Sequence, residues 1–220
     1  MIAYSRCLFL PVAALVLAGC STSSNQQPTS NIQHPASAPD LYRVKLETGK
    51  GDIVLEVHKD WAPLGADRFY QLVQSGFFDG ARFFRVISGF MVQFGIAGDP
   101  KVQSLWRMSP LMDDPVKQSN TKGRISFAMA GPQSRTTQVF INLVSNARLD
   151  GSGFSPFGEV VSGMDVVEKL YSGYGESYPG GNGPRPDLIQ TQGNALSGKG
   201  FPAPGFHQEG DNPVAKRTNI

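Results

Sequence analysis

Residues 83–93 read Phe-Phe-Arg-Val-Ile-Ser-Gly-Phe-Met-Val-Gln, and this stretch decides the fold. Two short β-favouring runs, at 82–87 and 90–94, flank Ser88 and Gly89, which is the pattern of two strands joined by a turn. Runs of the same kind follow at 125–130, 139–143 and 157–161, each bounded by Gly, Pro, Asn or Ser. The chain is therefore predicted to be mainly β, built from many short strands.

A further pair of strands precedes this stretch. Residues 42–47 alternate polar and apolar side chains, residues 48–51 (Thr-Gly-Lys-Gly) supply a turn, and residues 52–57 are strand-like again. This arrangement predicts a β-hairpin.

Two segments carry the spacing of amphipathic helices. In 63–75 apolar residues recur every three or four positions, with Pro63 at the start and Gly76 after the end. Residues 164–171 show a similar apolar stripe. The stripes consist of Ala66, Phe69, Leu72 and Val73 in the first segment and Val166, Val167, Leu170 and Tyr171 in the second. Short strands with two helices favour a closed antiparallel barrel with helical caps.

The composition limits both the architecture and the partners. The chain has 220 residues, 40% of them hydrophobic and 17% charged, which is enough for one sizeable core. Its 25 glycines and 16 prolines argue against a helix bundle, because both residues are poorly tolerated inside helices. The formal net charge is +2 and like charges form no long run, so we expect no nucleic-acid partner. We also expect a monomer.

Residues suited to other chemistries are scarce. Both cysteines, Cys7 and Cys20, lie among the first twenty residues, which excludes disulfide frameworks, CxxC redox sites and Cys-ligated zinc from the rest of the chain. The three histidines have no Ser or Cys nucleophile beside them in sequence, which argues against a Ser-His-Asp hydrolase. We interpret Asp113-Asp114 as a solvated turn rather than a metal or glycosidase site. No metal and no cofactor are expected.

The N-terminus has the features of a secretion signal. Residues 7–17 form an apolar run of eleven residues, too short to cross roughly 30 Å of hydrocarbon but suited to a signal peptide. The run ends in Leu17-Ala-Gly-Cys20, which resembles the lipobox of bacterial lipoproteins. That resemblance implies that residues 1–19 are removed and that Cys20 carries the lipid anchor. The alternative is an ordinary signal peptide.

The resemblance to a lipobox predicts that the protein is located in a bacterial envelope. Stable anchoring needs more than one acyl chain, and bacterial lipoproteins carry several. Ser21, next to the anchor, favours the outer membrane, with the domain facing the periplasm. Residues 20–40 are interpreted as a flexible tether, because residues 21–39 contain no Asp, Glu, Lys or Arg and almost no large aliphatic residue.

The C-terminal part offers weaker signals. Residues 172–183 contain five glycines in twelve positions without the GxGxxG spacing of a phosphate loop, so we interpret them as a flexible connection. Residues 187–191 are compatible with one last strand. Residues 194–220 are interpreted as a Gly/Pro-rich tail, poorly ordered or draped on the surface, and the folded domain is assigned to 41–193.

Several motifs together resemble one known family. The stretch 83–93 is followed by Ser126-Phe-Ala-Met-Ala-Gly-Pro132 and Thr137-Gln-Val-Phe-Ile-Asn142, then by Leu149-Asp-Gly151 and Phe157-Gly-Glu-Val-Val161. In this order they resemble the cyclophilin family of peptidyl-prolyl cis-trans isomerases, over about residues 42–171. The resemblance implies a closed eight-stranded antiparallel β-barrel capped by two α-helices, with a peptide groove on its outer surface.

The same resemblance implies the site and the substrate. Arg85 corresponds to the catalytic arginine. Phe90, Met91, Phe140 and Leu149 are expected to line a proline pocket, and Gln93, the backbone of Ala128 and Met129, and Gln138 to hold the peptide. The expected substrates are proline-containing polypeptides that are unfolded or still folding, so the implied role is protein folding in the envelope.

The residue types suit this reaction on physical grounds. Rotation about an X-Pro bond is opposed by about 18–20 kcal/mol, because the amide C–N bond is partly double. In the twisted state the nitrogen regains a lone pair, which a fixed guanidinium N–H can bond better than it bonds the planar amide. Arginine stays protonated and offers a planar fork of donors.

The resemblance leaves open questions at the groove. Strict alternation would put Phe90 and Met91 on opposite faces, so an irregularity is expected at Gly89. The loop 152–156 is one residue longer than is usual in the family and lacks its groove histidine, and whether Phe154 covers that part of the pocket is left open. Two other functions therefore stay in view: a proline-peptide-binding module or chaperone with little turnover, and a structural envelope lipoprotein.

Overall fold

The computed structural model describes residues 37–198 and, for the backbone alone, residues 214–216. They all belong to one compact unit, which begins at Pro35. The predicted signal peptide, Cys20, most of the predicted tether, and residues 199–213 and 217–220 of the predicted tail lie outside the described residues.

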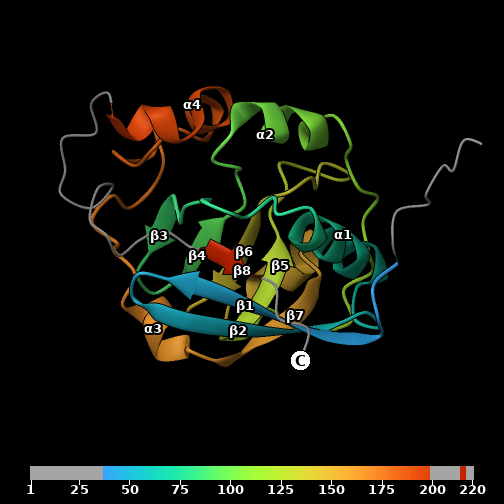
Figure 1. The fold of residues 1–220 in the computed structure, drawn as a ribbon. Helices are drawn as coiled ribbons and strands as arrows, with labels where there is room; N and C mark the ends of the chain where they lie inside the picture. The colour runs from blue at the N-terminus through green and yellow to red at the C-terminus, as the bar shows by residue number, and fades with distance from the viewer. Residues whose placement is uncertain (1–36, 199–213, 217–220) are drawn as a thin grey trace, which may run out of the picture. The chain divides into compact units, whose positions relative to one another are not determined.

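A single antiparallel sheet forms the body of the protein (Figure 1). Its strands are β1 (Leu41–Thr48), β2 (Gly51–His58), β3 (Arg85–Ile87), β4 (Met91–Phe94), β5 (Arg124–Phe127), β6 (Val139–Asn142), β7 (Pro156–Ser162) and β8 (Val214–Lys216). They lie in the order β3-β4-β6-β5-β7-β2-β1-β8. The seven strands from β1 to β7 occupy the segments predicted from the sequence.

Hydrogen bonds do not close this sheet. Among the described strands, β3 at one edge pairs only with β4, and no pairing joins it to β1 or β8. The mainly β, antiparallel architecture is confirmed, whereas the closed eight-stranded barrel is not. The three-residue β8 comes from the predicted tail and pairs with β1.

The β1–β2 hairpin shows how local sequence sets register. The two strands pair from Leu41↔His58 to Thr48↔Gly51, which leaves a two-residue loop. The Thr48 hydroxyl donates to the Gly51 carbonyl at 2.7 Å and accepts from the Lys50 amide at 3.1 Å, so the turn is held by a side chain of its own strand. The inward residues are fully buried, as the alternation predicts: Leu46, Ile53, Leu55 and Val57.

Four α-helices and two 3₁₀ segments complete the described fold. They are α1 (Pro63–Gln74), α2 (Pro100–Arg107), α3 (Met164–Glu168), α4 (Pro186–Gln192), η1 (Ala147–Ser152) and η2 (Gly193–Gly198). Both predicted helices are confirmed as α1 and α3, although α3 ends three residues earlier than its apolar stripe does. The helix α2 was not predicted from the sequence.

The main core lies between α1 and the sheet. The ring centroids of Phe69 on α1 and Phe157 on β7 are 5.1 Å apart. The Phe157 ring lies at the same distance from the Phe127 ring on β5. Phe69 also contacts Phe78, which in turn contacts Phe94 on β4. This chain of buried rings fixes α1 across strands that come from distant parts of the sequence.

A smaller core includes residues from the segment predicted as a last strand and from the start of the predicted tail. Phe84 and Ile96 pack against Ile189 and Leu196 of the C-terminal part. The predicted strand at 187–191 is wrong, because Pro186 and Asp187 begin the helix α4 instead, as Pro and an acidic residue commonly do in a first turn. Packed residues therefore continue past position 193, and α4 lies beside α2 (Figure 1).

No helix in residues 37–198 has the length and apolarity needed to cross a bilayer. Ala38 belongs to the segment predicted as a tether, yet it is buried, and its N–H donates to Asp67 at 2.7 Å.

Candidate functional site

The β3–β4 hairpin positions the predicted catalytic arginine. The strands pair Arg85↔Gln93, Val86↔Val92 and Ile87↔Met91. Val86 is buried, while the neighbouring Arg85 side chain is 23% exposed, as alternation along a strand requires. Arg85 and Gln93 therefore stand opposite each other on the same face of the sheet.

The irregularity expected at Gly89 is a tight turn. Gly89 has φ +71°, and the Phe90 N–H donates to the Ile87 carbonyl at 3.0 Å. Phe90 consequently precedes β4 rather than lying on it. This frees Phe90 from strict alternation, so that Phe90 and Met91 can face the same pocket.

The structure brings most of the predicted site residues together around one pocket. Its lining consists of Arg85, Phe90, Met91, Gln93, Ala128, Met129, Phe140, Leu149 and Phe154. Phe140 stands opposite Gln93 in the β4–β6 ladder, and Leu149 comes from η1. The cavity measures about 260 Å³, just below the range of roughly 300–1,000 Å³ typical of small-molecule sites, so it suits one small ring better than a large cofactor.

The remaining predicted site residue, Gln138, lines an adjoining hollow. That hollow also contains Gln93, Ala128, Met129, Ala130, Ser134 and Thr136. The Gln93 amide donates to Gln138 Oε1 at 2.9 Å, and Gln138 accepts the Ala128 N–H on its backbone carbonyl at 2.9 Å. Gln93 thus connects Arg85 on one side with Gln138 on the other.

Two residues of the site, Phe154 and Glu176, were not assigned a role from the sequence. The Phe154 ring meets Phe140 edge to face with centroids 5.7 Å apart, and it forms part of the pocket wall. Glu176 reaches the site from the glycine-rich segment 172–183. The available sequence signal for Glu176 was weak, since it is the one acidic residue among those twelve positions.

The Arg85 guanidinium donates three side-chain hydrogen bonds to oxygen and one, from Nη1, to Met91 Sδ at 3.9 Å. Its Nε donates to Glu176 Oε1 and its Nη2 to Glu176 Oε2, both at 2.6 Å, while Nη1 donates to Gln93 Oε1 at 2.9 Å. The hydrogen bond with Arg85 lowers the pKa of Glu176 below its usual value. The Glu176 carboxylate is therefore ionised at neutral pH.

Hydrogen bonds of the neighbouring Asp150 position Leu149. The Asp150 carboxylate accepts hydrogen bonds from Ser119 Oγ at 2.5 Å and from the backbone and side-chain amides of Asn120 at 2.9 and 2.8 Å. Partial desolvation works against ionisation, but these bonds outweigh it and lower the pKa of Asp150. They hold η1, and with it Leu149, against the segment that contains Ser119 and Asn120.

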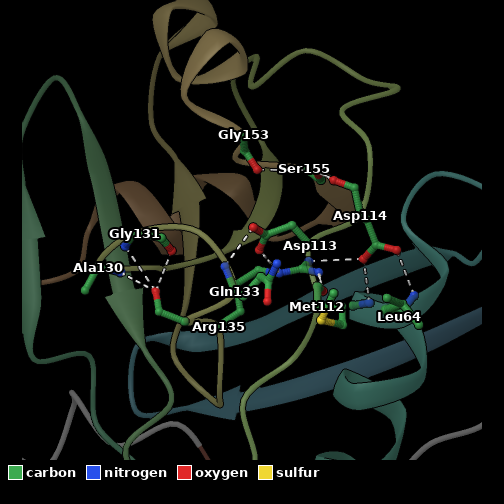
Figure 2. A network of polar contacts seen from close by, with 12 residues as sticks. Leu64, Met112, Asp113, Asp114, Ala130, Gly131, Gln133, Arg135, Gly153 and Ser155 are labelled. Carbon is green, nitrogen blue, oxygen red and sulfur yellow. Dashed lines mark hydrogen bonds and ion pairs between the residues drawn. The ribbon is translucent and has the colours of Figure 1, made fainter.

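A buried network holds the loop that carries Ala128 and Met129 (Figure 2). Arg135 Nη1 lies 3.1 Å from Asp114 Oδ2, and Arg135 also donates to the Met112 carbonyl. Asp114 accepts the N–H groups of Leu64 and Gly65 at the start of α1, at 3.0 and 2.9 Å. The interpretation of Asp113-Asp114 as a solvated turn is therefore wrong for Asp114, which is 5% exposed.

The part of the chain that the structure describes contains one group of side chains spaced for a metal ion. Glu56, His58 and Glu159 offer ligand atoms within 4.8 Å of one another. Arginines already pair with both carboxylates, since Arg43 lies 2.8 Å from Glu56 and Arg124 lies 3.6 Å from Glu159. None of the three lines the pocket, so we assign no metal to the site.

Comparisons with known proteins point to one family. Residues 43–189 match the family described as cyclophilin type peptidyl-prolyl cis-trans isomerase/CLD. A peptidyl-prolyl cis-trans isomerase of Acinetobacter baylyi is 34% identical over 133 residues, covering 58% of this chain and 70% of that protein. Peptidyl-prolyl cis-trans isomerase B of Escherichia coli is 36% identical over 136 residues, covering 58% and 82%. Peptidyl-prolyl cis-trans isomerase A of Dickeya dadantii is 38% identical over 139 residues, covering 58% and 70%.

Proposed function

The chain belongs to the cyclophilin-type peptidyl-prolyl cis-trans isomerases, and we propose that it accelerates X-Pro isomerisation by stabilising the twisted amide with the Arg85 guanidinium. The observation that carries this proposal is the position of Arg85. Its guanidinium lines an apolar pocket beside Phe90, Met91 and Phe140. The reaction is a rotation, so it requires no covalent intermediate.

The pocket supports the reaction in two ways. Its apolar lining takes up the proline ring, which holds one side of the amide while the preceding residue turns. With a peptide bound, the lining also keeps water from the side of the guanidinium that faces the amide, so that a hydrogen bond to the amide nitrogen strengthens as that nitrogen becomes pyramidal. One preorganised donor in such a site is worth about 3 kcal/mol, or roughly a hundredfold in rate.

The peptide on either side of the proline needs separate contacts. In this proposal Phe90, Met91, Phe140 and Leu149 bind the ring, with Phe154 added to the wall. Gln93, the backbone of Ala128 and Met129, and Gln138 hold the neighbouring residues along the adjoining hollow. The substrates are proline-containing segments of unfolded or folding polypeptides.

An isomerisation assay with Arg85→Ala tests this mechanism. We expect the variant to lose about a hundredfold in kcat/KM for a proline tetrapeptide while it binds the peptide nearly as well, because Arg85 acts on the twisted state. Arg43→Ala is the matched control, since it removes a half-exposed arginine that pairs with Glu56 outside the pocket.

Two outcomes would contradict the mechanism. Equal rates for wild type and Arg85→Ala would remove Arg85 from catalysis. Tight peptide binding by the wild type without acceleration would favour a binding module or chaperone instead.

We also propose that the protein acts as a monomer anchored in a bacterial envelope, in the outer membrane and facing the periplasm, through lipid on Cys20. The support is the sequence Leu17-Ala-Gly-Cys20 after an apolar run of signal-peptide length. Fractionation of Cys20→Ala tests the anchor. We expect release from the membrane fraction, and unchanged membrane association would refute lipidation at this position.

A further inference from the structure

The glycine-rich segment 172–183 brings a carboxylate to the catalytic arginine. Gly175 forms an antiparallel bridge with Val86 in the middle of β3. In an antiparallel register, the residue after Gly175 stands opposite the residue before Val86. Glu176 therefore faces Arg85 by backbone pairing, and not only by the reach of two long side chains.

Two glycines allow the chain to fold tightly around Glu176. The Gly183 N–H donates to the Glu176 carbonyl at 2.8 Å. A Cβ at Gly181 would lie 2.5 Å from that carbonyl oxygen, and one at Gly183 would lie 2.7 Å from it, closer than real Cβ atoms approach. The glycine content of this segment thus has a structural purpose that its spacing alone did not indicate.

The carboxylate itself is held at both oxygens. Oε1 accepts from Arg85 Nε at 2.6 Å and from the Ser177 N–H at 2.8 Å, and Oε2 accepts from Arg85 Nη2 at 2.6 Å. A bidentate pair of this kind fixes the plane of the guanidinium as well as its position. The Nη1 group is left on the side of Gln93 and the pocket.

We propose that Glu176 is a positioning residue for Arg85: it locks the Nε and Nη2 edge of the guanidinium so that the opposite side presents its donors to the X-Pro amide. This inference rests on the role of Arg85 proposed above. A donor that is already oriented needs no reorganisation in the transition state, so Glu176 assists the rotation step rather than peptide binding.

The same contact has an opposite interpretation, in which the carboxylate masks Arg85. The geometry favours positioning, because Glu176 occupies only one edge of the fork and Arg85 still lines the pocket. The two interpretations predict opposite signs: loss of the carboxylate slows the enzyme if it positions Arg85 and speeds it if it masks Arg85.

The test is a double-mutant cycle of Glu176→Gln and Arg85→Ala in the full chain, with kcat and KM measured on a proline tetrapeptide. Glutamine keeps the shape of the side chain but turns one of the two acceptors into a donor, which breaks the fork. We expect kcat to fall about tenfold, equivalent to about 1.4 kcal/mol, with KM within about twofold. In the Arg85→Ala background, Glu176→Gln should have no further effect on kcat.

The control is Asp187→Asn, which removes the bidentate pair with Arg185 from the same C-terminal region. Neither residue lines the pocket, so we expect wild-type kinetics. Gly181→Ala provides a second route to the same effect, because it displaces the Glu176 backbone while the carboxylate stays chemically intact. Thermal unfolding of each variant verifies that the fold is intact.

The results separate this inference from the proposed function. An unchanged or increased kcat in Glu176→Gln, with Arg85→Ala still inactive, overturns positioning and leaves the role of Arg85 standing. An equal loss of kcat in both backgrounds also overturns it, because Glu176 would then act without Arg85. If Arg85→Ala has wild-type activity, both proposals fail together.

Discussion

Two arginine–carboxylate pairs of this protein, one in the interior and one at the pocket, differ in burial and in geometry. The side chains of Arg135 and Asp114 are 2% and 1% exposed, and their charged groups lie 3.1 Å apart. Arg85 and Glu176 are 23% and 39% exposed and form a bidentate pair at 2.6 Å. The first pair is part of the interior, and the second stands at the edge of a cavity.

The difference shows what each pair can contribute. The buried pair is tied into the fold, because Asp114 also accepts the first N–H groups of α1 and its backbone carbonyl accepts from Ser155. Removing one partner leaves an uncompensated charge in the interior. The pair at the pocket remains in contact with water, so its contribution to the free energy of folding is small, and the role that we propose for it is to orient the Arg85 guanidinium.

The largest expected effect comes from breaking the buried pair. Asp114→Asn removes the buried carboxylate beside Arg135 and leaves that buried guanidinium only the partly exposed Asp113, 3.3 Å from its Nε, so we expect a loss of about 3 kcal/mol in the free energy of unfolding. Urea denaturation measures it. Asp113→Asn is the control: it removes the other carboxylate that pairs with Arg135, but the Asp113 side chain is 31% exposed, so its removal should cost much less. Equal losses for the two variants would show that burial does not distinguish them.

The pair at the pocket should instead respond to acid. Arg85 is the ionisable group that faces Glu176, and it lowers the pKa of that carboxyl. The orienting charge is therefore present above the usual glutamate pKa and is lost as pH falls through the lowered value. We expect kcat to decline only below about pH 4, and this decline to be missing from Glu176→Gln. Circular dichroism at each pH separates it from unfolding, and a decline centred above pH 5 would contradict the assignment.

A smaller effect is expected at the pocket wall. Phe154→Ala removes an edge-to-face contact with Phe140, which is worth about 1 kcal/mol. Since Phe154 contributes to the wall and not to charge stabilisation, KM should rise a few fold with kcat nearly unchanged. A fall in kcat at constant KM would place Phe154 in the rotation step.

The smallest expected effect is the change in stability when the pair at the pocket is broken. Glu176→Gln should change the free energy of unfolding by less than about 1 kcal/mol, because the pair it breaks is partly solvated. Denaturation under the conditions used for Asp114→Asn allows a direct comparison. A loss as large as that of Asp114→Asn would mean that the 172–183 segment is essential to the fold.

Elements that depend on neighbouring residues could be predicted from the sequence. The hairpin β1–β2 and the helix α1 follow from alternation and from three- and four-residue spacing, since each buries one face of a local element. The family resemblance assigned Phe90 and Met91 to one pocket, and the irregularity that this requires was expected at Gly89, which has a positive φ. These features depend on a few neighbouring residues.

The rest depends on contacts between distant parts of the chain. From its neighbours in sequence, Asp114 is expected at the surface. It is buried instead, because it pairs with Arg135, 21 positions away. Glu176 is 91 positions from Arg85, and only the bridge between Gly175 and Val86 brings the two together. Residues 187–191 suit a strand locally, but Pro186 and the packing of Ile189 with Phe84 make them helical. Periodicity carries no information about such pairings.

Exchange between the cis and trans forms of an enzyme-bound proline peptide, measured by NMR at saturation, tests the central claim most directly. It reports the rotation step apart from binding. The predicted order of rates is wild type, then Glu176→Gln about tenfold lower, then Arg85→Ala about a hundredfold lower, with similar peptide affinities. An Arg85→Ala exchange rate equal to that of the wild type would contradict the account.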